Sequence, residues 1–273
     1  MMIIKSCKLF DKLNQFKSGA NKYVESFSCS RYIYTKCLGG VYLIAFLSLG
    51  MQVQGLFGKE GIMPIQGYLS LIIQKVGAAI PLKIPTVFWL NSSDTTLIAA
   101  CIVGGVGGCM MIAGIYPRIA AIMNWIIYGS FLSVGAPFLH FQWDILIMEM
   151  GFLSIFFLPW KNTKDSPIST PFFLLLQLLL FRIIFMAGLV KLNSGDLSWQ
   201  TLTALSYHYW TQPLPHIGGW LAQQLPPFIH SISTLATLII ECVAPFTLFM
   251  GRRIRYAGLI AILILMVLIT LTG

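Results

Sequence analysis

The stretch FFLLLQLLLFRIIFMAGLVKL, residues 172–192, decides the fold class of this chain. It has about the length that an α-helix needs to cross the hydrocarbon core of a bilayer, and its only charged residues are Arg182 and Lys191. Similar stretches recur along the 273 residues, of which 57% are hydrophobic and 10% are charged. Soluble domains carry about 25% charged residues. We therefore expect an all-α protein, a polytopic transmembrane helical bundle.

Working outward from this stretch, hydropathy predicts about seven spans. They lie near Cys37–Gln54, Thr95–Ile115, Ile119–Leu139, Ile145–Pro159, Phe172–Leu192, Ile232–Met250 and Tyr256–Gly273. The segment between the first two spans contains PIQGYLSLIIQKVGAAIP, residues 64–81, with apolar residues at helical spacing and a proline at each end. This pattern predicts an interfacial helix in the first outer loop.

The basic residues are unevenly distributed, and this predicts the orientation of the chain. Thirteen of the 18 Lys and Arg residues lie in residues 1–36 and after the second, fourth and sixth spans, against three in the first outer loop. Positive loops stay in the cytoplasm, so residues 1–36 are predicted to be a basic cytoplasmic tail with little fixed structure, and residues 37–273 the transmembrane bundle. The net charge of +9 then needs no nucleic acid partner.

The sequence lacks the motifs of several classes of enzyme and of metal sites. No cysteine falls in a predicted outer loop and no CxxC occurs, which argues against disulfides and a thiol–disulfide enzyme. HExxH, GxSxG and a phosphate-binding loop are also absent, and His208 has no metal-ligating neighbour at the usual spacing. We expect no metal site, and the sequence names no cofactor.

Charged residues inside predicted spans are the first candidates for a role, because each costs about 2.5–3.5 kcal/mol to insert. By depth, Arg182 is expected to pair with Glu241 or Glu149, and Lys191 with Asp144 or Glu149. These pairs either hold the bundle together or, for Lys191, act on solutes that reach the outer end of the fifth span.

Two predicted outer segments form a candidate binding face. In FQWD, residues 141–144, Asp144 begins a span and is expected to cap its helix. YHYWTQPLP, residues 207–215, is interpreted as a stiff, proline-locked loop that lies over Lys191 beside Asp144. The alternative is an aromatic belt along the headgroups. The residues of the candidate face are Gln142, Trp143, Asp144, Tyr207, His208, Tyr209 and Gln212.

The segments FQWDILIMEMGFL, FRIIFMAGLVKL and YHYWTQPLP, together with GLFGKEGIMP at residues 55–64, resemble the lipase maturation factor family. The resemblance runs from about residue 37 to the last residue. It implies a multi-span membrane protein, whose eukaryotic members sit in the endoplasmic reticulum and help secreted lipases fold and assemble. Members of the family continue beyond the point that matches Gly273, so we expect a chain truncated at the C-terminus relative to them.

A more distant similarity is to the vitamin-K-dependent γ-glutamyl carboxylase, through AGLVKL at residues 187–192. It implies a catalytic base at Lys191. Desolvation at the end of a span favours the neutral amine that such a base needs. Gly188, one turn earlier on the same face, is expected to let another helix or a ligand approach closely.

Three functions remain open at this stage. The first is a folding or assembly factor, a chaperone in protein maturation, acting on secreted lipases or other exported clients. The second is a membrane enzyme using Lys191, and the third is a transport or structural protein. Membrane lipid is the expected partner in each. Short loops and the lack of outer cysteines favour a bacterial inner membrane, and the endoplasmic reticulum is expected if the host is eukaryotic.

Overall fold

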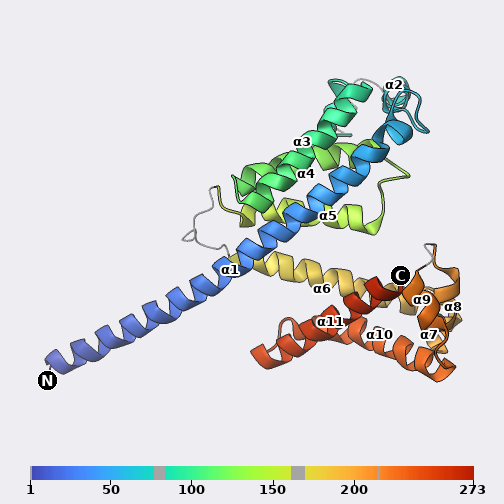
Figure 1. The fold of residues 1–273 in the computed structure, drawn as a ribbon. Coiled ribbons are helices and arrows are strands. Elements are labelled where there is room, and N and C mark those ends of the chain that lie inside the picture. The colour runs from blue at the N-terminus through green and yellow to red at the C-terminus, as the bar shows by residue number, and fades with distance from the viewer. Residues whose placement is uncertain (1, 77–83, 161–169, 214–215) are drawn as a thin grey trace. The chain divides into compact units, whose positions relative to one another are not determined.

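The computed structural model describes residues 2–76, 84–160, 170–213 and 216–273 (Figure 1). Within these ranges the regular elements are all helices, which confirms the all-α class. The chain divides into two compact units, Met1–Phe173 and Leu174–Gly273. Each unit is described by itself below.

The first unit is a stack of long helices that follow one another along the chain. Its elements are α1 (Met2–Phe57), α2 (Ile65–Val76), the 3-10 helix η2 (Val87–Trp89), α3 (Asp94–Ala113), α4 (Pro117–Val134) and α5 (Gln142–Phe157). Helix α3 packs between α1 and α4, and α4 packs against α5. The rings of Phe46 and Tyr128 meet edge to face at 5.6 Å in the core of this unit.

Glycines bring α1 and α3 into backbone contact. A Cβ atom added to Gly108 would lie 2.8 Å from the backbone nitrogen of Leu43, and one added to Gly39 would lie 2.8 Å from the carbonyl oxygen of Gly108. Small residues let helix backbones approach closely where lipid provides no hydrophobic drive for association. The GGVGG run at 104–108 therefore packs inside the unit, as its composition predicts.

The second unit contains most of α6 (Thr170–Asn193) and the elements that follow it. These are α7 (Leu197–Gln200), α8 (Ala204–Thr211), α9 (Ile217–Gln223), α10 (Pro227–Thr247) and α11 (Arg252–Thr272). Helices α10 and α11 pack together as a hairpin. Ile184 of α6 joins Ala244 of α10 and Ile262 of α11 in a buried apolar cluster. The short helices α8 and α9 pack on each other and on α10 and α11 respectively.

Five helices of the described residues are long and apolar enough to cross a membrane. They are Ser30–Phe57, Asp94–Ala113, Pro171–Asn193, Pro227–Thr247 and Arg252–Thr272. The chain is therefore an all-α membrane bundle. The two remaining predicted spans coincide with α4 and α5, which do not meet these limits of length and hydropathy. The total of seven spans stays a prediction.

The structure corrects the prediction of a tail with little fixed structure, because α1 is helical from Met2 onward. Residues 1–36 contain no proline and only one glycine, so nothing in this segment interrupts the helix that continues into the apolar part of α1. In the first loop, α2 confirms that a helix forms after Pro64. Residues 77–81, the rest of the predicted interfacial segment, lie outside the described residues. The position of α2 at a membrane surface stays a prediction.

The side of the membrane on which residue 140 lies would show whether the chain crosses the membrane seven times or five. No Lys or Arg occurs between Arg118 and Lys161, so the charge bias is the same whether α4 and α5 cross the membrane or not. In a variant without native cysteines, we expect a cysteine at the exposed position His140 to react with a membrane-impermeant reagent from outside, like one at Asn91. Labelling of position 140 from the cytoplasm, with position 91 still outside, would mean that α4 and α5 do not cross.

Candidate functional site

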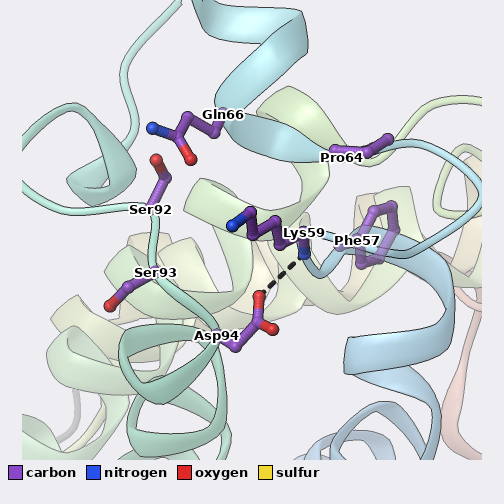
Figure 2. A pocket seen from close by; sticks show the side chains of 7 residues that line it. All are labelled: Phe57, Lys59, Pro64, Gln66, Ser92, Ser93 and Asp94. Atoms are coloured by element: carbon purple, nitrogen blue, oxygen red, sulfur yellow. Dashed lines mark hydrogen bonds between the residues drawn. The ribbon is translucent and has the colours of Figure 1, made fainter.

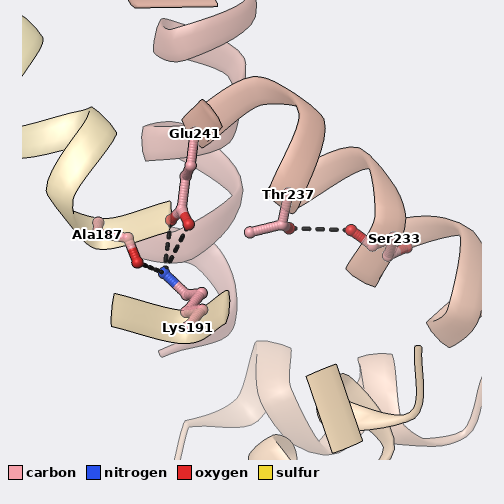
Figure 3. Close-up of polar contacts among 5 residues, drawn as sticks. All are labelled: Ala187, Lys191, Ser233, Thr237 and Glu241. Atoms are coloured by element: carbon pink, nitrogen blue, oxygen red, sulfur yellow. Dashed lines mark hydrogen bonds and ion pairs between the residues drawn. The ribbon is translucent and has the colours of Figure 1, made fainter. Parts of the chain in front are cut away.

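Lys191 and Glu241 form an ion pair between α6 and α10 in the second unit (Figure 3). The Nζ atom of Lys191 donates to both carboxylate oxygens of Glu241 at 2.7 Å and to the carbonyl oxygen of Ala187 at 3.5 Å. The Glu241 side chain is only 4% exposed, whereas that of Lys191 is 25% exposed. The three N–H bonds of the ammonium are thus used within the protein, and the carboxylate depends on the lysine for its charge balance.

Gly188 explains why these two side chains meet. A Cβ atom added at Gly188 would lie 2.6 Å from the Sγ atom of Cys242 and 3.0 Å from the Cβ atom of Glu241. Helices α6 and α10 therefore touch one turn before Lys191, which confirms the close approach predicted for this glycine.

The ion pair gives Lys191 a partner that the sequence did not predict for it. Depth along the spans favoured Arg182 for Glu241 and a carboxylate of the first unit for Lys191. In the structure it is Lys191 that holds both oxygens of Glu241, because its long stem reaches back along α6 past Gly188. Arg182 is exposed within the second unit. Its predicted pairing with Glu149, a half-buried residue of the first unit, stays a prediction.

Trp199 covers Lys191, and sequence reasoning missed it. The Lys191 ammonium lies 5.5 Å from the centre of the Trp199 ring, within the range of a cation–π contact. After α6 the chain turns at Gly195, which has a φ of 73°, and Asp196 caps α7 by accepting a bond from the Ser198 N–H at 2.9 Å. Hydrogen bonds from the backbone and from the side chain of Ser198 lower the pKa of the exposed Asp196 carboxyl. The turn signal Ser-Gly-Asp at 194–196 was the available clue that residues 197–200 fold back.

The first five residues of YHYWTQPLP are helical and do not form the predicted loop, which is a second correction. Tyr207–Thr211 form the end of α8, and Gln212 is extended immediately before Pro213. A proline disfavours the helical conformation for the residue before it and has no N–H to continue the helical hydrogen bonds, so α8 runs up to Thr211 and ends before Pro213. Leu214 and Pro215 lie outside the described residues.

The side chains of this segment have partners other than those predicted. The Nε2 atom of His208 lies 3.3 Å from the carbonyl oxygen of Gly273, and the Tyr209 ring lies 5.8 Å from that of buried His230. Burial raises the pKa of Tyr209, and a hydrogen bond with Thr272 partly opposes this. The cover over the ion pair is thus Trp199, and His208 and its neighbours face the end of α11. The amide of Gln212 lies against Gly219 and Gly273.

Asp144 caps its helix, as predicted, from the third position of α5. Its Oδ2 atom accepts from the backbone N–H of Phe141 at 3.0 Å, and its Oδ1 atom accepts from the hydroxyl of Tyr128 at 2.6 Å. Asp144 and Tyr128 are both buried, at 2% and 4% exposure. The carboxylate therefore joins α4 to the start of α5. Gln142 and Trp143 are exposed beside it, and Trp143 stacks on the ring of Phe141.

A small pocket of about 220 Å³ lies in the first unit, between the end of α1 and the start of α3 (Figure 2). The backbone N–H of Lys59 donates to the Asp94 carboxylate at 2.8 Å across it. The GLFGKEGIMP segment forms a compact turn here, in which Ile62 and Met63 donate to the carbonyl oxygens of Gly55 and Leu56. This turn connects the end of α1 to the start of α3 through the bond between Lys59 and Asp94. Within the described ranges, no cluster of three or more His, Cys, Asp or Glu residues is placed to hold a metal ion.

Comparison with known families and proteins finds relatives that match most of this chain. Residues 29–273 match the lipase maturation factor transmembrane domain. Lipase maturation factor 2 of Gallus gallus is 35% identical over 256 residues, which cover 89% of this chain and 36% of the relative. The Homo sapiens protein of that name is 34% identical over 89% of this chain and 37% of the relative. Lipase maturation factor 1 of Mus musculus is 31% identical over 92% of this chain and 46% of the relative.

This chain thus spans between about a third and a half of the length of these relatives. No solved structure matches it. The relatives come from vertebrates and give no support to the predicted bacterial inner membrane. The family match covers all five helices that are able to cross a membrane, and the chain belongs to the lipase maturation factor family.

Proposed function

We propose that this chain acts in the endoplasmic reticulum membrane as the transmembrane part of a lipase maturation factor, assisting secreted lipases or other exported proteins to fold or assemble. The observation that carries this proposal is the match of residues 29–273 to the transmembrane domain of that family. Its relatives are named for lipase maturation and come from organisms that have this organelle.

The geometry of Lys191 favours this non-enzymatic role over a carboxylase-like reaction. A general base needs a free lone pair within hydrogen-bonding reach of the proton that it removes. The Nζ atom of Lys191 instead donates three hydrogen bonds within the protein, two of them to a buried carboxylate. Trp199 covers it as well. The arrangement suits a cation that joins α6 to α10.

A chimera tests the proposed function in the setting of a whole relative. In cells that lack lipase maturation factors, residues 29–273 of this chain would replace the matching region of the Mus musculus lipase maturation factor 1. We expect the chimera to restore active lipase in the medium several-fold over untransfected cells, because this chain matches the transmembrane domain of the family and is 31% identical to the mouse protein over 265 residues. The measurement is lipase activity per amount of lipase protein, in cells and in medium.

The intact mouse relative is the positive control, and abundance in the endoplasmic reticulum is measured for every variant. A chimera that is as abundant and as correctly located as the mouse protein, but leaves the lipase inactive, would contradict the proposal.

A further inference from the structure

Helices α8 and α9, together with the residues that follow α9 up to the first turn of α10, expose large apolar and aromatic side chains in the second unit. These side chains are between 46% and 79% exposed: Tyr207, Trp210, Ile217, Trp220, Leu221, Leu225 and Phe228. The whole segment from 193 to 231 contains no Lys or Arg and only one acidic residue, Asp196. An exposed apolar face of this extent marks a surface that binds either lipid or another protein.

The contacts on the opposite side of α8 show where this face lies along the membrane-spanning helix α10. The backbone N–H of Leu205 donates to the Thr234 hydroxyl at 3.4 Å, and Tyr209 contacts His230. Helix α10 begins at Pro227 and is one of the helices long and apolar enough to span the membrane. Thr234 lies seven residues after that start, about 10 Å along the helix axis. Helix α8 therefore runs beside the end of α10 and does not lie above it.

Helix α9 has the same relation to α11. A Cβ atom added to Gly218 would collide with the carbonyl oxygen of Leu271, and one added to Gly219 would lie 2.6 Å from that of Thr272. These carbonyls belong to the last turn of α11, a second membrane-crossing helix. Figure 1 shows α7, α8 and α9 gathered at this end of α10 and α11. Both short helices are thus level with the terminal turns of the spans that they contact.

We propose that α8 and α9 form an interfacial collar, whose exposed aromatic face binds the boundary between headgroups and acyl chains of an uncharged, zwitterionic leaflet. At the depth of the terminal turns, a side chain that points away from α10 and α11 meets this boundary. Trp and Tyr prefer it, because their rings are apolar and their N–H and O–H groups still reach water. The absence of basic residues leaves nothing to attract anionic lipid. The collar does not depend on a lipase client, and it holds whichever protein this chain serves.

Quenching of tryptophan fluorescence tests the collar in full-length protein reconstituted in phosphatidylcholine vesicles. The signal of Trp210 and Trp220 is the difference between the unchanged protein and the variant W210F/W220F, a substitution that keeps an aromatic ring at each site. We expect phosphatidylcholine brominated near the headgroup to quench this signal more than lipid brominated near the chain ends. Aqueous iodide is expected to quench it weakly.

The variant W125F is the matched control, because the half-buried Trp125 donates from Nε1 to the carbonyl oxygen of Met148 inside the first unit. Its difference signal should respond little to shallow bromines or to iodide. Strong quenching of Trp210 and Trp220 by iodide, without quenching by lipid, would overturn the collar and leave the face free for a protein partner. Quenching that requires added phosphatidylserine would overturn the preference for uncharged lipid. Both outcomes are independent of lipase maturation in the chimera.

Discussion

Replacement of Lys191 with methionine is expected to destabilise the second unit by about 3–5 kcal/mol, because it leaves the Glu241 carboxylate buried without its cation. Glu241 is 4% exposed and takes both of its short hydrogen bonds from Lys191. The reverse change, Glu241→Gln, is expected to cost less. Lys191 is 25% exposed, so its ammonium can turn toward water near the end of α6. Unfolding in mixed detergent micelles, followed by circular dichroism, measures both effects.

The double variant K191M/E241Q completes a double-mutant cycle with the two single variants. It removes both charges, so it should recover much of the stability that Lys191→Met loses. Lys191→Arg is a milder control that keeps the charge. A Lys191→Met protein that is as abundant and as stable as the unchanged one would show that the pair does not hold α6 to α10.

The same double variant also separates the two leading functions when it is placed in the chimera. If it folds and still restores active lipase, Lys191 has no catalytic role. If it folds normally but the lipase stays inactive, the charged pair acts directly in function, as a carboxylase-like mechanism would require.

Replacement of Gly108 with alanine is expected to separate α1 from α3 and to cost about 1–3 kcal/mol, the usual range for overpacking a close contact. The new Cβ atom would lie 2.8 Å from the Leu43 nitrogen and 2.9 Å from the Gly39 carbonyl oxygen. These are backbone atoms, so no side chain can rotate away to make room. Thermal unfolding in detergent and yield in the membrane fraction measure the loss.

Neighbouring glycines provide matched controls on the same two helices. At Gly105 the nearest atom to an added Cβ is Leu43 Cδ1 at 3.8 Å, and at Gly40 nothing lies within 4 Å. Gly105→Ala and Gly40→Ala should therefore be neutral or slightly stabilising, because alanine is the better helix former. Gly39→Ala should behave like Gly108→Ala. Equal effects at positions 105 and 108 would reject this account of the α1–α3 contact.

The sequence by itself determined the helical class and the approximate positions of the apolar segments. In lipid each backbone N–H and C=O must find a partner within its own helix, so local hydropathy located the five helices that are long and apolar enough to cross a membrane. The role of the GGVGG run and of Gly188 was predictable for a related reason, since a missing side chain permits close approach whatever the partner is. The capping role of Asp144 likewise follows from its position beside a helix start.

Tertiary structure alone decided which side chains meet. Depth along a span does not specify the rotation of one helix against another, so Glu241 could not be assigned to Lys191 before the contact at Gly188 was known. Trp199 reaches the same ammonium only because the chain reverses at Gly195. The collar was hidden for the same reason. The sequence cannot distinguish its exposed aromatic residues from an aromatic belt on a loose loop. Only the contacts of Leu205 with Thr234 and of Gly218 with Leu271 show how deep these residues lie.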